Sequence, residues 1–510
     1  MIRYAFVTVT DRNYFPGTLA TIGSVLEFHP HATVYVLDNA PRGLSEAQAG
    51  ALRREPRVRL LPSSDFARDG RYIDAWELKA YGMCDLAERG EVDVLVGIDS
   101  DCLLCGDVDR EIRQCVEFGG FIGGADGEGA DYDEAYAAYG IDTPARNDRH
   151  MSTSLYFCAV NEANKTVLRR WAQCCAAAEF NGRGPYPGHG DQGVLNAVLF
   201  AADRGERVQL LDNALWSQHW TYWQADIGLQ DGAFVNRSAG GRRQRAFHCV
   251  NGDKFWMAGH RDRVLAAHAA QAYPYAWFLA MLWFGRCRDE SADPFELLEP
   301  HAHHLVDDLV HELPLILQVY PAARQRWNAV SDRLLERLLD GIARTMGLHG
   351  GSLSEAIELV AGFRNLRRCV HLGGDDGGSV LALALRFANR DLQFYAVESL
   401  AQRHPPWSRA AHMALLSRFP SLRVQAVPGD SASAAALFAE RSVDMLFIGA
   451  CDDADTVLRD LDAWRARLAP AGVIAGDGYD RPPVEQAVAQ RFREIFVSPS
   501  GRVWWAQAGR

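Results

Sequence analysis

The 510-residue sequence has no apolar run long enough to cross a lipid bilayer as a helix, which takes about 20 consecutive apolar residues. The most apolar stretch, YPYAWFLAMLWFG, covers only residues 273–285. Such a stretch is typical of a buried helix, and a face that docks on a membrane surface or a partner is the alternative. Both interpretations of this segment are open at the level of sequence.

Ordered cysteine patterns are also missing. The eleven cysteines include no two pairs at the spacing of zinc ligands, and their number is odd. This argues against a disulfide scaffold or a paired-cysteine zinc site and is typical of reduced thiols. The opening residues, MIRYAFVTVT, resemble a strand and not a signal peptide. We therefore expect a cytoplasmic protein.

An excess of basic residues is the third absence. Lysine and arginine number 53 against 65 acidic residues, for a formal net charge of −12. This balance argues against a nucleic-acid binder. The run GGRRQR is a local exception. Its Arg242, Arg243 and Arg245 fit either a mobile lid over a phosphate or a solvated loop.

Alternating strand-like and helix-like segments fill residues 1–256. We expect strands at 4–9, 32–38, 58–62 and 93–99, with helices at 17–29 and 75–90 among them. This rhythm predicts an α/β, Rossmann-like domain with a mainly parallel sheet, whose ligands bind beyond the carboxyl ends of the strands. Residues 257–352 lose the strand signal and are interpreted as a helical connector. The α/β pattern returns over residues 353–510, so the sequence predicts two α/β domains.

A pair of aspartates, Asp99 and Asp101, stands where the apolar strand VLVGI ends. Carboxylates at such a point can bind a divalent cation and leave positions open for phosphate oxygens. The pattern alone is weak, because acidic triplets are common on protein surfaces. Further segments are needed to decide between a metal site and a solvated turn.

Two later segments carry polar residues suited to such a site. HGDQGVLNAVL places Asp191 and Gln192 just before a predicted helix, where they face a ligand or, for Asp191, cap the helix. FHCVNGDKFW supplies His248, whose neutral imidazole is a good metal ligand, and Lys254, whose ammonium suits a diphosphate.

The opening segment AFVTVTDRNYFPG adds a candidate nucleoside contact. Tyr14 follows a strand and can stack on a base, and Thr8 or Thr10 can meet the edge of that base. Taken alone, this segment is a polar loop.

Together these segments resemble the GT-A-fold glycosyltransferases of the glycogenin and bacterial galactosyltransferase type, over about the first 256 residues. That family presents a base-stacking tyrosine, an Asp-x-Asp pair, an Asp-Gln…Leu-Asn segment and a His…Lys…Trp segment in this order. The matching residues are Tyr14, Asp99, Asp101, Asp191, Gln192, Leu195, Asn196, His248, Lys254 and Trp256. Asn251 and Phe255 depart from the family's usual glycine and proline. HMSTSLYFCAV replaces the family's sugar-contacting strand, which leaves the particular sugar undefined.

The resemblance implies a metal-dependent, retaining transferase that moves a sugar from a UDP-sugar to a glycan, glycolipid or small-molecule acceptor. The implied residues are Asp99, Asp101 and His248 for Mn²⁺ or Mg²⁺; Asp191 and Gln192 as catalytic residues at the donor sugar; and Thr8, Tyr14, Asp99 and Lys254 for the nucleotide, with Lys79 and Asp126 as weaker pocket candidates. Contact with the inner face of a membrane and homo-oligomer formation are further expectations left open.

A second ligand-binding pattern lies near the C-terminus. CVHLGGDDGGSVLALA predicts a strand, a glycine loop that lets backbone approach a ligand, and a helix. The next strand ends at Glu398, placed to bind a ribose diol. These segments resemble class I S-adenosylmethionine methyltransferases, especially the sugar O-methyltransferase-like group, over about residues 360–510. The implied cofactor-binding residues are Gly373, Gly377, Ser379, Glu398 and Asp430.

This second domain departs from the methyltransferase pattern at acidic positions. His371 stands where an acid is usual, and Gly449, Cys451 and Gly478 stand where aspartates are common. Two interpretations follow. The domain O-methylates the glycosylated product with S-adenosylmethionine, or it is a catalytically dead module for binding or oligomerisation.

Overall fold

The computed structural model describes residues 2–39, 42–66, 73–126, 130–131, 137, 140–141, 146–147, 150–178, 190–201, 207–212, 216, 226–249, 254–260, 272–286, 297–323, 350–363, 365–373, 380, 383–384, 387, 390–398, 423–449 and 453–508. The chain divides into two compact units. The first contains residues 1–309 and 318–323, and the second contains residues 310–317 and 324–510.

A seven-stranded sheet forms the centre of the first unit. Its order is β10-β6-β9-β4-β1-β2-β3, and the strands are β1 (Tyr4–Thr10), β2 (Thr33–Asp38), β3 (Val58–Pro62), β4 (Val94–Ile98), β6 (Phe121–Ala125), β9 (Met151–Ala159) and β10 (Val208–Leu211). Only β9 among these strands runs antiparallel to its neighbours. The four strands expected at the start of the chain are present, and the predicted α/β class is confirmed.

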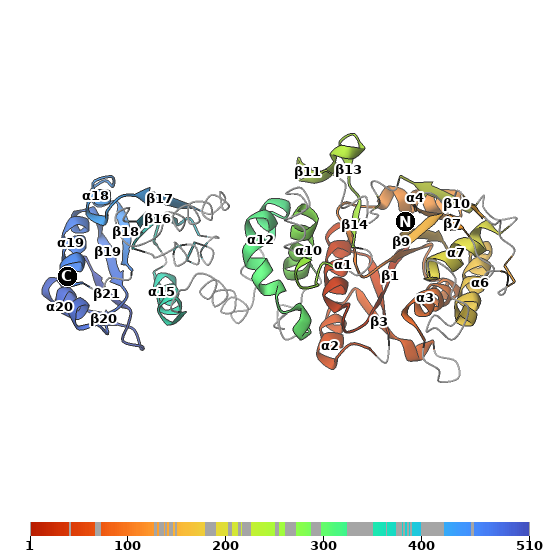
Figure 1. Cartoon of the computed structure of the whole chain (residues 1–510), viewed down its shortest axis with the longest axis horizontal. Helices are drawn as coiled ribbons and strands as arrows, with labels where there is room; N and C mark the ends of the chain where they lie inside the picture. Colours follow the sequence, from red (N-terminus) through yellow and green to blue (C-terminus); the bar gives the residue numbers. More distant parts are fainter. Residues whose placement is uncertain are drawn as a thin grey trace. The chain divides into compact units, whose positions relative to one another are not determined.

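Helices cover both faces of this sheet (Figure 1). The helices of this unit are α1 (Phe15–Phe28), α2 (Glu46–Arg54), α3 (Ala75–Arg89), α4 (Asp109–Phe118), α6 (Glu162–Ala178), α7 (Gly190–Phe200) and α10 (Ala272–Phe284), and α12 (Leu305–Val319) has residues in both units. Every residue of β4 and β9 is buried. A strand with both faces covered needs apolar residues without alternation, which is why VLVGI appears as a continuous run.

Within that run, position 97 is a glycine for a steric reason. It lies opposite Tyr156 in the register of β4 and β9. A β-carbon at Gly97 would come 2.2 Å from a ring carbon of Tyr156. The missing side chain thus makes room for the fully buried Tyr156 ring, which lies 5.9 Å from Nζ of Lys79 at the edge of the site.

The aromatic segment at 273–285 forms α10 and packs against α1. Trp277 donates a hydrogen bond of 2.8 Å to the carbonyl of Leu104. A β-carbon on Gly285 would lie 2.9 Å from Cα of Gly23, so the two helices nearly touch. The side chains from Tyr275 to Phe284 are buried. The buried-helix interpretation is therefore the right one, and this part of the predicted 257–352 connector packs within the first unit.

Among the described residues, no helix combines the length and apolarity needed to span a membrane.

The second unit has its own seven-stranded sheet, ordered β17-β16-β15-β18-β19-β21-β20. Its strands are β15 (Arg368–Leu372), β16 (Gln393–Glu398), β17 (Val424–Pro428), β18 (Val443–Ile448), β19 (Leu468–Gly476), β20 (Phe496–Val497) and β21 (Trp504–Gln507), and its helices include α15 (Gly350–Gly362), α18 (Ser431–Ala435), α19 (Ala454–Trp464) and α20 (Pro482–Arg491). The first five strands are parallel, and β21 and β20 return antiparallel at one edge. The chain therefore contains two sheet-centred α/β bodies, as expected.

Candidate functional site

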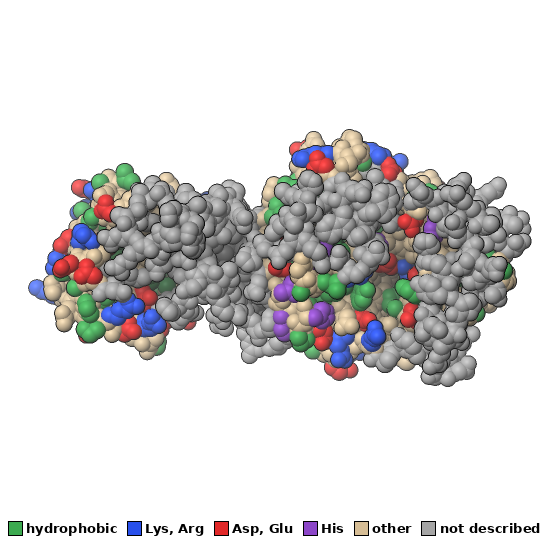
Figure 2. All heavy atoms as spheres, viewed as in Figure 1, with side chains coloured by type: hydrophobic (Ala, Val, Ile, Leu, Met, Phe, Trp, Pro, Cys, Tyr) green, Lys and Arg blue, Asp and Glu red, His purple; other side chains and the backbone are tan. Residues whose placement is uncertain are grey.

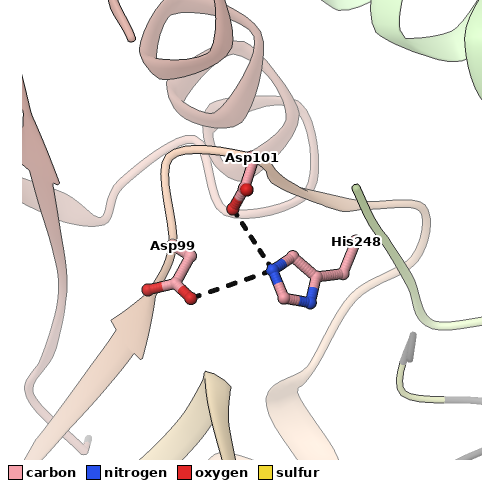
Figure 3. A group of neighbouring side chains, drawn as sticks. All are labelled: Asp99, Asp101 and His248. Atoms are coloured by element: carbon pink, nitrogen blue, oxygen red, sulfur yellow. Dashed lines mark ion pairs between the residues drawn. The ribbon is translucent and has the colours of Figure 1, made fainter. Parts of the chain in front are cut away.

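Three ligand-type side chains meet beyond the end of β4 (Figure 3). Asp99 follows β4 directly, Asp101 precedes β5 (Cys102–Leu104), and His248 ends β14 (Ala246–His248). Antiparallel pairing of β14 with β5 places His248 opposite Cys102 and thus beside Asp101. Nε2 of His248 lies 3.2 Å from Oδ1 of Asp101 and 3.8 Å from Oδ2 of Asp99. One ligand atom from each residue lies within 4.8 Å of the others.

The chemistry of this trio fits a divalent cation. Asp101 and His248 are buried, whereas the Asp99 side chain is one-third exposed. Burial alone would raise the pKa of Asp101, but His248 and Lys254 together hold that pKa well below its usual range. Asp101 is therefore a carboxylate at neutral pH. Two carboxylates and an imidazole form an oxygen and nitrogen donor set suited to a divalent cation.

Lys254 and Tyr14 lie beside the trio. Lys254 donates hydrogen bonds to Asp101 and, over 3.1 Å, to the carbonyl of Cys249. Its Nζ lies 5.5 Å from the centroid of the Tyr14 ring. Trp256 meets the same ring edge-on at 5.4 Å. The structure thus brings the two predicted nucleotide residues together with the trio.

The two threonines predicted to meet the base edge, Thr8 and Thr10, differ in their hydrogen bonding. Thr8 in β1 is buried, and within the described part of the chain its Oγ1 has no hydrogen-bond partner. The hydroxyl of Thr10 instead lies 2.6 Å from that of Thr18, so Thr10 is occupied within the fold.

Asn39 is a further buried polar residue beyond the end of a strand, and the sequence analysis did not single it out. It is buried and directly follows β2, and its backbone N–H donates to the carbonyl of Thr10. Its Oδ1 has no hydrogen-bond partner among the described atoms. The only signal available in the sequence was its place one residue beyond a strand.

Lys79 connects the metal trio to the predicted donor-sugar residues. Its Nζ donates to Oδ1 of Asp99 over 2.6 Å and to the carbonyl of Thr153 over 2.9 Å. It also lies 3.5 Å from Oδ2 of Asp191. Helix α7 begins at Gly190, so Asp191 lies inside the first turn and does not cap it. Burial raises the pKa of Asp191 to about 6, and Lys79 limits this rise.

Gln192 is held between two strands. Its side-chain oxygen Oε1 accepts from the backbone N–H of Thr153 over 3.0 Å, and its side-chain nitrogen Nε2 donates to Asp126 at the end of β6. Asn196, one turn later, bonds both the N–H and the carbonyl of Met151 over 2.8 Å. These amides fasten α7 to β9, so the Asp-Gln…Leu-Asn segment has a clear positioning role.

The basic run lies on a small three-stranded sheet of β11 (Ile227–Gln230), β12 (Ala233–Asn236) and β13 (Arg242–Arg243). Arg242 pairs with Asp212 over 2.5 Å, and Arg245 donates to the carbonyl of Asp107. Figure 2 shows basic and acidic side chains together over this sheet. The exposed Arg242, paired with an acidic residue, agrees with the solvated-loop interpretation.

In the second unit, Gly373 follows β15 with a left-handed φ of 62°. A β-carbon on Gly373 would lie 3.2 Å from the carbonyl oxygen of Gly449. Asp430 is exposed and caps α18 by accepting from the N–H of Ser433 over 3.0 Å. Glu398 ends β16, but its side chain lies outside the described residues, as do Gly377 and Ser379.

Gly449, where the methyltransferase pattern has an aspartate, has no room for a side chain. Its β-carbon would lie 2.7 Å from the carbonyl oxygen of Gly373 and 2.9 Å from the ring of His371. His371 is buried and stacks on Phe447 at 5.1 Å. Burial lowers the pKa of His371 to about 4, so its ring is neutral at pH 7. The local packing thus accommodates the loss of two acidic side chains.

Comparison with solved structures finds similarity in both halves. The apo form of the bifunctional glycosyltransferase WbbM is 13% identical, with a TM-score of 0.38 over 56% of this chain, and the match spans only half of that protein. The galactosyltransferase LgtC, solved with donor and acceptor sugar analogues, is 16% identical, with a TM-score of 0.36 over 55% of this chain and 96% of its own.

A putative O-methyltransferase from Klebsiella pneumoniae is 19% identical, with a TM-score of 0.27 over 36% of this chain and 98% of its own. No curated protein is significantly similar to the sequence. Residues 370–479, within the second unit, match the family model of methyltransferase domains.

Proposed function

We propose that the first unit is a metal-dependent, retaining glycosyltransferase that transfers a sugar from a UDP-sugar to a glycan, glycolipid or small-molecule acceptor. The observation that carries this proposal is the convergence of Asp99, Asp101 and His248 within 4.8 Å at the carboxyl end of the sheet. Parallel α/β sheets bind their ligands at this edge. The proposal includes a cytoplasmic location.

Each neighbouring side chain has a role in this proposal. Asp99, Asp101 and His248 hold Mn²⁺ or Mg²⁺, which when bound supplies charge stabilisation to the diphosphate. Lys254 neutralises the same leaving group. Tyr14 stacks on the uracil, and Thr8 meets its edge.

On the sugar side, Asp191 and Gln192 are the proposed catalytic residues that face the donor sugar. Lys79 sets the charge of Asp191 and orients its carboxylate. The bond from the anomeric carbon to the diphosphate breaks, and a bond from that carbon to the acceptor oxygen forms on the same face. The acceptor proton passes to the departing diphosphate.

For the second unit we propose binding of S-adenosylmethionine at the Gly373 turn and O-methylation of the glycosylated product. Its support is the methyltransferase-domain match and the left-handed glycine after β15. The alternative is a dead binding or oligomerisation module. It is favoured by Gly449, where contact with Gly373 leaves no room for a carboxylate.

The first unit is tested by UDP release from a panel of UDP-sugars, with Mn²⁺ and with chelator. Wild type should release UDP from one UDP-sugar of the panel when Mn²⁺ is present, and from none when chelator is present. Asp101→Asn should abolish this release and also Mn²⁺ binding, measured directly by electron paramagnetic resonance. Glu117→Gln, an exposed acid on α4, serves as the matched control and should change neither. Full activity in the Asp101 variant would refute the metal assignment.

A further inference from the structure

An exposed tryptophan stands beside the proposed sugar pocket. Trp76 is the second residue of α3, and its backbone N–H donates to the capping carboxylate of Asp74 over 3.0 Å. The residue is 40% exposed. Large aromatic side chains usually bury more of their surface than this.

Helix geometry places Trp76 close to the polar groups of the site. It precedes Lys79 by three residues, so both side chains lie on one face of α3, one turn apart. Nζ of Lys79 contacts both Asp99 and Asp191. The indole therefore lies on the face of α3 that carries the lysine bonded to these two carboxylates.

The indole also contacts α7. A β-carbon on Gly190 would lie 3.3, 3.4 and 3.4 Å from Cδ2, Cε2 and Cε3 of Trp76. Nearly equal distances to three consecutive ring atoms place that point over the face of the six-membered ring, because an approach in the ring plane would give unequal distances. One face of the indole thus backs onto Gly190, beside Asp191, so the 40% of the residue that is exposed belongs to other parts of its surface.

We propose that Trp76 is a stacking wall for a hexose ring and so a specificity-determining residue of this site. The inference rests on the proposed function. A sugar ring has apolar C–H faces and a polar rim, and it fits a flat apolar wall with charged hydrogen-bonding groups at its edge. Ligand sites commonly combine aromatic walls with a few placed polar groups. Trp76 provides the wall, and Lys79 and Asp191 provide the polar edge.

The ring belongs to the donor or to the acceptor, and binding experiments on the full chain distinguish them. Calorimetry with Mn²⁺ would compare UDP with UDP-glucose and UDP-galactose, in wild type and in Trp76→Ala. For a donor wall, Trp76→Ala should weaken the hexose nucleotide by about tenfold and leave UDP unchanged. For an acceptor wall, both nucleotides bind as in wild type. The KM for methyl glycosides of glucose, galactose or mannose then rises by a similar factor, with kcat nearly retained.

Two further variants separate stacking from folding. Trp76→Phe keeps a flat ring and should restore most of the lost affinity. Phe118→Ala removes an aromatic residue of nearly equal exposure, 39%. Phe118 is the last residue of α4 and precedes the amino end of β6, at the opposite edge of the sheet, so its loss should change nothing. Circular dichroism and the melting temperature verify that each variant is folded.

Wild-type values for every ligand in a folded Trp76→Ala variant would overturn the stacking wall. An equal loss of affinity for UDP and UDP-hexose would also overturn it, because that pattern indicates a general disturbance of the site. Wild-type protein that binds neither UDP nor a UDP-hexose would overturn the proposed function and this inference with it.

Discussion

Trp256 lies across Gly17 so closely that a β-carbon at position 17 would come 2.2 Å from the indole and 2.3 Å from the carbonyl oxygen of Ser100. Ser100 is the residue between the two aspartates of the metal trio. The missing side chain on α1 therefore lets the Asp-x-Asp turn and the Trp256 segment close on the same helix. The ring of Tyr14, just before this helix, also meets the Trp256 indole edge-on.

Gly17→Ala should destabilise the first unit by about 1–3 kcal/mol, since a new methyl group must displace a backbone carbonyl as well as a ring. It should also weaken Mn²⁺ binding, because the displaced carbonyl belongs to the Asp99–Asp101 turn. Gly50→Ala in α2 is the control. Its β-carbon meets nothing closer than 3.7 Å, and the substitution should stabilise the helix slightly. Thermal unfolding and metal titration measure the two effects. A melting temperature of Gly17→Ala equal to that of wild type would contradict the packing argument.

Lys79→Met should cost on the order of 3 kcal/mol of folding free energy, because it leaves Asp191 buried without its cation. Adding Asp191→Asn to this variant should recover part of the loss, since the unpaired charge is then gone. The measurement is chemical unfolding of wild type, both single variants and the double variant. Strictly additive effects would show that the contact between Lys79 and Asp191 carries no coupling energy.

Asp191 should make the stability of the first unit depend on pH. Its pKa is about 6 in the folded protein and about 4 in an unfolded chain. The folded state therefore binds the proton more tightly. The contribution of Asp191 to stability is fully present below about pH 4 and is lost as the pH rises through about 6.

Asp191→Asn removes this titration. The difference in unfolding midpoint between wild type and the variant should therefore change between about pH 4 and pH 6 and be constant above that range. Urea unfolding across this window measures it. A constant difference throughout would mean that Asp191 titrates normally.

In the second unit, S-adenosylhomocysteine should bind, and Gly373→Ala should weaken it by more than about tenfold. The substitution places a side chain at a left-handed φ, at the predicted cofactor turn. Gly501→Ala is the matched control, since Gly501 also has a positive φ, 78°, but has open space around it. Calorimetry measures both. Absence of binding to wild type would favour the dead binding or oligomerisation module.

The elements of this protein follow from local sequence patterns. The apolar run at 94–98 predicts a strand buried on both faces, and the aromatic run at 272–284 predicts an apolar helix. The choice of ligand-type residues is also local, since Asp99 and Asp101 follow a strand and His248 ends one. These patterns predict two α/β units, and the resemblance to the glycosyltransferase family implies the residues of the metal trio.

Tertiary packing decided what the patterns left open. Whether α10 met a membrane or a core depended on its contact with α1, far away in the chain. Lys79 was a weak candidate until the fold placed its ammonium between Asp99 and Asp191, and Trp76 became notable only beside Gly190. Composition and periodicity report which face of an element is apolar. They do not report which distant element that face meets, because this depends on sheet order and on the fit of side chains across the interface.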